Sequence, residues 1–474
     1  MAPRAITPEE QQLAQTLLER ARAAMRAIEA LDQASVDRLC QAIAWAAANE
    51  VTSTRLARMS VEESGMGIPE PSRRGKVLGI LRDALRQKSV GIIEEISERG
   101  IVKYAKPAGV ITSLIPVTSP YITPIGIAIY AIKCKDAVIF SPHPASRKTT
   151  NEVVRLMREA LKRQGVAEDV LQCVERPSIP LANELMARAD LTIATGGPAM
   201  VKAAYSSGKP AYGVGAGNAT MVIDETADIA EAARNTRISK TNDNGSGCSA
   251  DGNLLVDSRI YDQFLDALQK EGGYLVNDRE KDLLRTAYWD SEGHRTAETI
   301  ARPARLVADR AGFSLPDSKT FLIVPEEHIG RQHLFSTEKL GTVLAIFKYH
   351  GFDDALVKVR QIFETGGKGH SCGIYSFDDE HIHALALVAP VSRIMVRQVQ
   401  SRANAGTFTN GMPMTSSMGC GTWGGNITHE NISLKHYMNV TWVSRPIAED
   451  RPSDRELFGE FYNTEIFEPA ARTL

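Results

Sequence analysis

The sequence predicts an α/β protein with a doubly wound, largely parallel sheet. Short apolar runs alternate with segments of helical periodicity over residues 110–206, which is typical of repeated strand–helix units. A second α/β block begins near Ile238 and opens on a polar, glycine-rich loop around Cys248. Because 474 residues exceed what one core usually holds, we expect two or three domains.

Composition excludes several classes of protein. Hydrophobic residues make up 43% of the chain, charged residues 24%, and the net charge is −2, so nucleic acid is not an expected partner. The N-terminus has no apolar signal core, and no apolar run approaches the length of a membrane span. The six cysteines are scattered without a CxxC pair. This pattern favours a reducing cytoplasm and predicts neither a disulfide framework nor a metal site.

The first hundred residues are predicted to be mainly helical. Apolar residues recur at helical spacing between Thr7 and Ala48, and Thr7-Pro8 resembles a helix N-cap followed by proline at the first helical position. A further helix is expected over 77–97. Residues 100–106 and 109–116 are predicted to be strands joined by a turn.

The strand–helix alternation then sets the main sheet. The expected strands are 110–115, 137–140, 169–174 and 191–195, and the expected helices are 122–131, 147–164, 180–189 and 198–206. Such sheets bind ligands at the carboxyl ends of their strands. The loops 116–120, 141–146 and 195–198 should therefore line one crevice.

The second block contains the Cys248 loop, a helix over 259–271 and further strands and helices up to His436. A strand is expected from Tyr437 onward. Small residues around Cys248 allow close backbone approach, and a polar loop leaves the thiol accessible to N–H donors. These conditions suit a nucleophilic thiolate and an oxyanion beside it. A buried structural cysteine is the alternative.

Three other small-residue segments stand out. Thr195-Gly196-Gly197-Pro198 follows an apolar strand and opens a helix, which fits either an anion-binding helix start or a plain tight turn. Residues 213–218 lack G-x-G-x-x-G spacing and precede a strand, so we interpret them as a glycine-rich wall close to another group. Residues 419–426 form either a pocket loop or a packed turn with Trp423 in a core.

Together these segments resemble the aldehyde dehydrogenase superfamily, specifically its CoA-acylating branch. The matching segments occur in the family's order over nearly the whole chain: 63–67, 115–120, 140–144, 194–197, 213–218, 243–248, 338–341, 367–370 and 419–426. The resemblance implies an aldehyde dehydrogenase-like fold with a Rossmann-type dinucleotide-binding domain, an α/β catalytic domain and a small β oligomerisation extension.

The resemblance also implies a mechanism. Cys248 would attack an aldehyde, and its own N–H would hold the oxyanion together with Ser119, which replaces the family's usual Asn. Hydrolytic members use a Glu to activate water, and the matching position here is Gly213. A thiol such as coenzyme A is more ionised than water near neutral pH and needs less help. The missing Glu therefore favours acyl transfer to CoA. Hydrolytic oxidation, or a non-catalytic chain, are the alternatives.

By the same carry-over, NAD or NADP is the expected cofactor and Arg147 lies near a possible 2′-phosphate. The residues expected near the dinucleotide are Ser141, His143, Pro144, Thr195, Gly196, Gly197, Gly215 and Glu338. Those expected in the aldehyde and CoA pocket are Thr118, His370, Cys420 and Thr422.

Domain limits and substrate complete the expectations. We expect a dinucleotide-binding domain over 1–98 and 117–236, a catalytic domain over 237–436, and an oligomerisation extension over 99–116 and 437–474. The extension predicts a homodimer or homotetramer. The substrate would be a short aldehyde, and the sequence is most similar to sulfoacetaldehyde dehydrogenases. Arg402 and the Thr/Ser cluster 415–417 are the residues we expect to bind a sulfonate.

Overall fold

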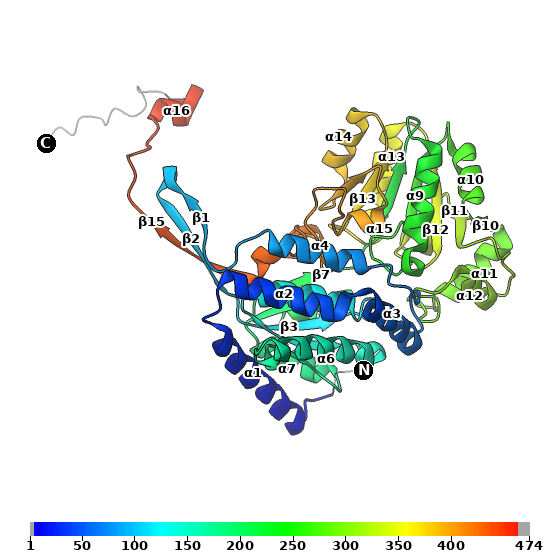
Figure 1. Ribbon diagram of the computed structural model, residues 1–474. Helices are drawn as coiled ribbons and strands as arrows, with labels where there is room; N and C mark the ends of the chain where they lie inside the picture. Colours follow the sequence, from blue (N-terminus) through cyan, green and yellow to red (C-terminus); the bar gives the residue numbers. More distant parts are fainter. Residues whose placement is uncertain (1–3, 463–474) are drawn as a thin grey trace.

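A computed structural model describes residues 4–462. It contains two parallel sheets and a three-stranded antiparallel ribbon that projects from them (Figure 1). The mixed α/β class expected from the sequence is confirmed.

The first sheet has the strand order β5-β4-β3-β6-β7, and all its neighbouring strands run parallel. Its strands are β3 (Val110–Ile115), β4 (Ala137–Pro142), β5 (Leu171–Cys173), β6 (Leu191–Thr195) and β7 (Ala211–Val214). The helices between them are α5 (Ile122–Lys133), α6 (Arg147–Arg163), α7 (Ile179–Arg188) and α8 (Pro198–Tyr205). Every residue of α5 is buried, because this helix packs inside the domain rather than on its surface.

The second sheet has the order β10-β11-β12-β9-β8-β13-β14 and is also parallel throughout. Its strands are β8 (Thr220–Ile223), β9 (Asn253–Asp257), β10 (Gly273–Leu275), β11 (Phe321–Pro325), β12 (Val343–Tyr349), β13 (Cys372–Tyr375) and β14 (Ile394–Val396). Its helices are α9 (Ile229–Thr241), α10 (Tyr261–Lys270), α11 (Asp278–Tyr288), α12 (Ala304–Ala311), α13 (Phe352–Thr365), α14 (Asp379–Val388) and α15 (Gln400–Ala403).

Four helices begin the chain: α1 (Pro8–Ile28), α2 (Gln33–Ala48), α3 (Glu50–Ser64) and α4 (Arg74–Leu85). Thr7 caps α1 in a capping box with Glu10, as the sequence predicted. The buried faces of α1, α2 and α4 join the hydrophobic core of the first sheet. In Figure 1, α4 lies on the side of this domain that faces the second sheet.

The ribbon consists of β1 (Gly91–Ile96), β2 (Ile101–Pro107) and β15 (Met438–Ser444), paired antiparallel in the order β1-β2-β15. It extends away from both sheets, and α16 (Asp454–Phe458) follows it (Figure 1). The strand expected from Tyr437 is therefore present. The rest of the expected C-terminal extension, 463–474, lies outside the described residues.

The two sheets meet edge to edge across one crevice. In the first sheet, the carboxyl ends of β3, β6 and β7 lie on the same side. From this side the chain passes directly from β7 into the start of β8, which belongs to the second sheet. Because the second sheet is parallel, the starts of β8, β9, β12 and β13 share one edge. Loops from the carboxyl edge of one sheet thus meet loops from the amino edge of the other.

Three expectations about elements and boundaries are wrong. The helix expected over 77–97 ends at Leu85, and Gly91, with φ of +68°, starts the exposed strand β1 instead. The strand β3 lies in the centre of the first sheet and not in the ribbon, because all its side chains are buried. The strand β8 pairs with β9 and β13, so the second domain starts near residue 220 and not near 237.

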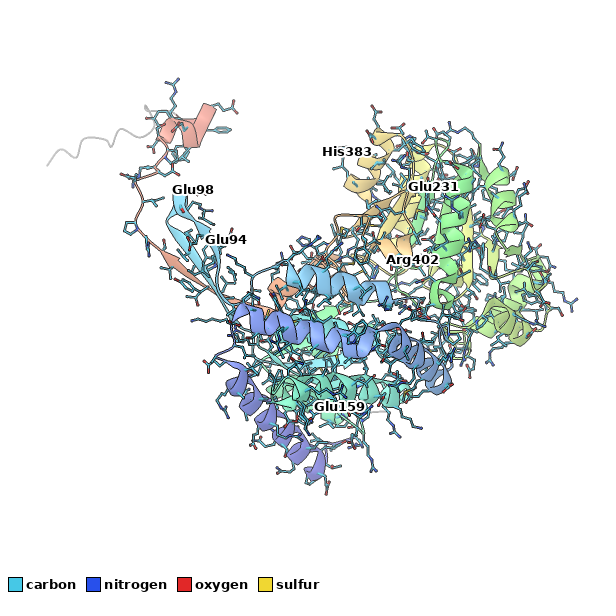
Figure 2. The ribbon with its side chains drawn as sticks, viewed as in Figure 1. Glu94, Glu98, Glu159, Glu231, His383 and Arg402 are labelled. Atoms are coloured by element: carbon cyan, nitrogen blue, oxygen red, sulfur yellow. The ribbon has the colours of Figure 1, made fainter. Side chains whose placement is uncertain are left out.

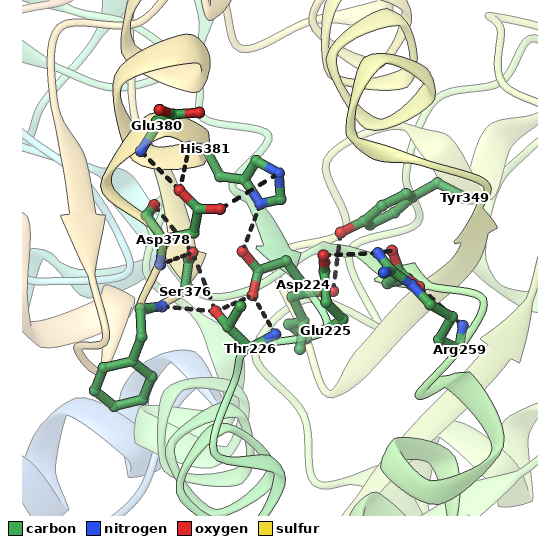
Figure 3. A network of polar contacts seen from close by, with 12 residues as sticks. Asp224, Glu225, Thr226, Arg259, Tyr349, Ser376, Asp378, Glu380 and His381 are labelled. Atoms are coloured by element: carbon green, nitrogen blue, oxygen red, sulfur yellow. Dashed lines mark hydrogen bonds and ion pairs between the residues drawn. The ribbon is translucent and has the colours of Figure 1, made fainter.

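A polar network joins the far edge of the second sheet to α14 (Figure 3). Asp224, just after β8, accepts hydrogen bonds from Thr226 and contacts His381 Nδ1 at 2.9 Å. Glu225 pairs with Arg259 at 2.8 Å. The side chains of Asp224, Glu225 and His381 lie close enough to hold a metal ion, but they are bonded within the chain. We interpret the network as a structural link between β8 and α14.

Candidate active site

The Cys248 loop connects α9 to β9 at the crevice edge of the second sheet. Asp243 and Asn244 adopt φ of +51° directly after α9, which turns the chain sharply before the cysteine. The backbone of the glycine-rich wall lies against this loop: a Cβ placed on Gly217 would come within 1.9 Å of the Cys248 carbonyl oxygen. The expectation that residues 213–218 pass close to another group is confirmed, and that group is the Cys248 loop.

His370 lies directly beside the cysteine. Its Nε2 is 3.0 Å from the Cys248 Sγ, and its Nδ1 is 2.8 Å from the Ser371 Oγ. The imidazole is fully buried at the start of β13. Arg393 holds this loop through hydrogen bonds from its guanidinium to the carbonyl oxygens of His370, at 2.8 Å, and Gly419, at 2.6 Å. The sequence placed His370 in the pocket wall but gave no signal of its contact with Cys248.

Burial keeps this pair neutral. Burial, followed by the charge of Glu338, raises the pKa of the Cys248 thiol to about 12, whereas the charges of Lys76 and Arg73 act in the opposite direction. Burial, with a contribution from the Arg393 charge, lowers the pKa of His370 to about 3. The resting pair is therefore a thiol and a neutral imidazole, which can accept a proton.

Glu338 approaches the same loop from a turn before β12. Its Oε1 accepts a hydrogen bond from the Gly217 N–H at 2.9 Å, and its Oε2 pairs with Arg295, also at 2.9 Å. Burial raises the pKa of Glu338. The carboxylate thus fixes the glycine-rich wall. Arg295, which holds it in place, was not expected from the sequence.

The loop 419–426 packs against the loop that carries His370. A Cβ on Gly369 would lie 1.7 Å from the Cys420 carbonyl oxygen, so the two backbones touch. Cys420 is buried, whereas Thr422 and Trp423 are exposed. The alternative that placed Trp423 in a core is therefore wrong, because the short turn at 422–424 directs its ring outward.

Gly213 has no room for a side chain. A Cβ there would lie 2.7 Å from the Tyr205 ring and 2.8 Å from Val201. The Tyr205 hydroxyl also hydrogen-bonds to the N–H of Gly213 at 3.0 Å and to its carbonyl oxygen at 3.3 Å. The space that a side chain on Gly213 would occupy is thus filled by a tyrosine from α8.

The loop after β3 supplies the opposite wall. Thr118 and Ser119 line one small cavity together with Arg73 and Asp243. Asp243 belongs to the Cys248 loop, so the expected pocket residue Thr118 and the expected oxyanion donor Ser119 lie next to that loop. The backbone N–H of Cys248 makes no hydrogen bond within residues 4–462, which leaves it able to donate to an oxyanion.

The residues expected near a dinucleotide follow β4 and β6. Ser141 is buried in β4, while His143 and Pro144 are exposed just after it. The helix α8 begins at Pro198 without a side-chain cap, and a Cβ on Gly197 would meet nothing within 4 Å. These features fit the diphosphate of a dinucleotide, which binds at open helix starts.

Thr195 and Ser417 come together across the crevice, with their hydroxyl oxygens 3.0 Å apart. The fully buried Thr415 donates to Ser417 and Ile432 carbonyl oxygens, so this cluster is bonded internally. Arg402 lies on the surface of the second domain in α15 and is exposed (Figure 2). Among residues 4–462 the Arg402 guanidinium makes no hydrogen bond or ion pair, so nothing in its surroundings supports the expected part in a sulfonate site.

The fold and this arrangement around a cysteine agree with the comparisons. The family model described as "Aldehyde dehydrogenase family" matches residues 5–443. The chain therefore belongs to the aldehyde dehydrogenase family, a family of oxidoreductases.

Three similar proteins refine this assignment. A sulfoacetaldehyde dehydrogenase of Acholeplasma sp is 42% identical over 451 residues, which cover 94% of this chain and 93% of that protein. The crystal structure of an acetylating aldehyde dehydrogenase from Geobacillus thermoglucosidasius superposes with a TM-score of 0.89 at 34% identity, covering 94% and 99% of the two chains. A Rhodopseudomonas palustris propionaldehyde dehydrogenase with bound propionyl-CoA gives a TM-score of 0.81 at 26% identity, covering 91% and 94%.

Proposed function

We propose that the chain is a CoA-acylating aldehyde dehydrogenase whose nucleophile is Cys248. It oxidises a short aldehyde with NAD(P)⁺ and passes the acyl group to coenzyme A, giving an acyl-CoA and NAD(P)H. The observation that carries this proposal is the contact of 3.0 Å between the Cys248 Sγ and the His370 Nε2. Gly213 supports it, because this position carries no water-activating base and a Cβ there would lie 2.7 Å from the Tyr205 ring.

His370 is the proton acceptor in this mechanism. With its proton on Nδ1, the imidazole donates to the Ser371 Oγ and leaves Nε2 free to take the S–H proton. Because the resting pair is neutral, the proton leaves Sγ as the sulfur attacks the aldehyde carbon. The product is a thiohemiacetal on Cys248.

The developing negative charge on the aldehyde oxygen is stabilised by the free N–H of Cys248 and by the Ser119 hydroxyl. A serine hydroxyl replaces the longer amide that the family usually carries here, and one donated hydrogen bond is enough for this role. The nicotinamide, when bound, supplies the hydride acceptor. Loss of hydride from the thiohemiacetal leaves a thioester on Cys248.

The thioester is then attacked by a thiol rather than by activated water. Tyr205 fills the space beside Gly213, so no carboxylate lies there to deprotonate water. A thiol needs less assistance, because it ionises more readily than water near neutral pH. The CoA thiol releases its proton to solvent as it attacks the thioester, and the attack displaces the Cys248 sulfur. The displaced sulfur then recovers the proton held by His370.

The cofactor is proposed to be NAD or NADP, bound where the first sheet meets the crevice. The open start of α8 beside Gly197 would receive the diphosphate, and Glu338 would bind the nicotinamide ribose. The exposed position of Arg147, on the first turn of α6, leaves room for a 2′-phosphate as well. Sulfoacetaldehyde is the proposed aldehyde, because the similar protein of Acholeplasma is named a sulfoacetaldehyde dehydrogenase.

The setting of the enzyme is also part of the proposal. No helix among the described residues is both long and apolar enough to cross a membrane. A cytoplasmic setting, where reduced thiols and coenzyme A are available, is proposed because the six cysteines are scattered without a CxxC pair. A homo-oligomer is proposed through the exposed ribbon. Its substrates are small molecules, and no nucleic acid partner is expected.

The test is NAD(P)H formation with a panel of short aldehydes, run with and without coenzyme A. We expect one equivalent of NAD(P)H per site without coenzyme A and steady turnover once it is added. Steady turnover without coenzyme A would mean that water resolves the thioester, which contradicts the argument from Gly213. A Cys248→Ala variant that retains turnover would overturn the role of the cysteine.

A further inference from the structure

The first turn of α4 forms a wall of the pocket that the sequence did not indicate. The Arg73 guanidinium donates to the Thr118 carbonyl oxygen at 3.1 Å and pairs with Asp243 at 2.7 Å; it also bonds to the Ser246 hydroxyl. Asp243 and Ser246 belong to the Cys248 loop, and Thr118 precedes Ser119. The start of α4 is therefore fixed between the two sides of the pocket.

The remainder of α4 lies along the loop 405–415. The Met414 N–H donates to Asp83 at 2.9 Å, and the Arg82 guanidinium lies 5.0 Å from the centre of the Phe408 ring. The helix thus runs from the cysteine loop to this second loop. Lys76 lies one turn after Arg73, so both side chains project from the same face of α4.

The charges around Cys248 leave Lys76 without a counterion. The Arg73 charge is matched by Asp243, and the Glu338 charge is matched by Arg295. Lys76 is partly buried, and its ammonium group has no hydrogen bond or ion pair within residues 4–462. An unpaired ammonium held away from water is costly, and an anionic ligand relieves that cost.

The electrostatics around the thiol agree with this position. Burial, followed by the charge of Arg73, lowers the pKa of Lys76 to about 8, while Cys248 and Asp243 act in the opposite direction. Because this pKa still lies above 7, the ammonium form remains the larger fraction at neutral pH. The charges of Lys76 and Cys248 therefore each affect the pKa of the other group, which agrees with the position of Lys76 one turn after Arg73.

We propose that Lys76 determines substrate specificity by binding the anionic head group of a short aldehyde whose carbonyl carbon lies at Cys248. This inference rests on the proposed function. A sulfonate or a carboxylate meets the requirement, since either offers charged oxygens to the ammonium group. Arg73 is a positioning residue, because its donors are already directed at Thr118, Asp243 and Ser246.

The first test needs no turnover. Cys248 is alkylated with iodoacetate, which is anionic, and with iodoacetamide, which is neutral and similar in size, and both rates are followed by mass spectrometry. We expect Lys76→Gln to lower the ratio of the iodoacetate rate to the iodoacetamide rate by roughly tenfold or more, because a charge-assisted contact is lost. Lys76→Arg should preserve the ratio. Lys88→Gln removes an exposed lysine just beyond α4 and is the matched control.

The second test compares aldehydes. With sulfoacetaldehyde, Lys76→Gln should raise KM by roughly tenfold or more, whereas propionaldehyde kinetics should change little. Succinic semialdehyde, which carries a carboxylate, is compared with sulfoacetaldehyde, which carries a sulfonate. The aldehyde whose kcat/KM falls more in Lys76→Gln carries the head group that the pocket binds better.

Three outcomes decide the proposal. An unchanged alkylation ratio in Lys76→Gln overturns it. An equal fall in kcat/KM with charged and neutral aldehydes also overturns it, because Lys76 would then act on the thiol and not on the head group. If no aldehyde is oxidised with coenzyme A but the alkylation ratio still falls, the proposed function fails while the anion preference of the pocket is supported.

Discussion

At the scale of single residues, the chemistry depends on a thiol and an imidazole that are both neutral at rest. A buried imidazole with a pKa near 3 is a poor base in isolation, and a thiol with a pKa near 12 is a poor acid. Their contact at 3.0 Å allows the proton to move only as the new carbon–sulfur bond forms. The pair thus limits side reactions of Cys248 before the aldehyde binds.

The role of His370 is tested by His370→Ala. We expect kcat to fall by roughly 10² to 10⁴, the usual contribution of a positioned base, with a smaller change in KM. The measurement is the rate of NAD(P)H formation in the first turnover, since NAD(P)H forms only after Cys248 has attacked the aldehyde. Ser371→Ala removes only the contact to Nδ1 and should cost less. A first turnover as fast as wild type in His370→Ala would contradict the mechanism.

Gly213→Glu tests whether Tyr205 excludes the hydrolytic base. The new side chain would collide with the Tyr205 ring at 2.7 Å, so we expect a lower melting temperature and no gain of CoA-independent turnover. Thermal unfolding and product analysis give the two readings. A stable variant that releases free acid without coenzyme A would show that the tyrosine does not govern the choice of nucleophile.

At the scale of elements, the catalytic groups are held by loops whose backbones touch. The loop 366–370 lies against the loop 419–426: a Cβ on Gly369 would lie 1.7 Å from the Cys420 carbonyl oxygen, and one on Gly424 would lie 2.9 Å from the Lys368 carbonyl oxygen. The same loop also lies against the glycine-rich wall, since a Cβ on Gly367 would lie 2.4 Å from the Asn218 nitrogen. Close packing of this kind fixes His370 without long side chains, and Arg393 adds hydrogen bonds from behind. The geometry of the dyad is therefore a property of the loops.

Gly369→Ala should break this arrangement. Its φ of +80° suits glycine, and the added Cβ would lie 1.7 Å from the Cys420 carbonyl oxygen. We expect a loss of stability of at least about 1–3 kcal/mol together with slower alkylation of Cys248. Denaturant unfolding and thiol labelling check both effects. Gly75→Ala, at an exposed helical position with nothing within 4 Å of the Cβ, is the matched control and should not destabilise.

The sequence predicted where helices and strands lie better than it predicted which strands pair with one another. Apolar periodicity located most strands and helices of the first sheet, because each depends on neighbours in the chain. The strand β8 was assigned to the wrong domain, since a buried apolar run carries no mark of which sheet it joins. The prediction that the helix continues past Leu85 was wrong. The segment 91–96 forms strand β1 because it pairs with β2, and the local periodicity of a segment does not indicate such pairing.

The same limit applies to the site. Cys248 and the glycine-rich wall were found from composition, since small polar residues mark a loop that approaches another group. The contact of His370 with Cys248 spans 122 residues, and that of Arg73 with Ser246 spans 173. No local pattern encodes such contacts, so Arg73, Lys76 and Arg393 emerged only from the folded chain.

At the scale of the whole molecule, the ribbon projects away from both sheets (Figure 1). β1 and β15 are both edge strands, and nearly every side chain of β15 is exposed. Val440 is 39% exposed and Trp442 is 56% exposed, and alternation places both on one face of the strand. Exposed apolar edges of this kind favour pairing with another chain, which is consistent with the proposed homo-oligomer.

The double variant Val440→Asp/Trp442→Asp tests that role. Two carboxylates on this face would oppose association, so we expect a smaller particle by size-exclusion chromatography with light scattering. Leu387→Asp replaces a still more exposed apolar residue on α14 and should leave the particle mass unchanged. Because Cys248, His370 and Glu338 all belong to one chain, the dissociated variant should still alkylate at Cys248. An unchanged mass would assign association to another surface, and a smaller particle without a reactive thiol would mean that the ribbon supports the site through its partner.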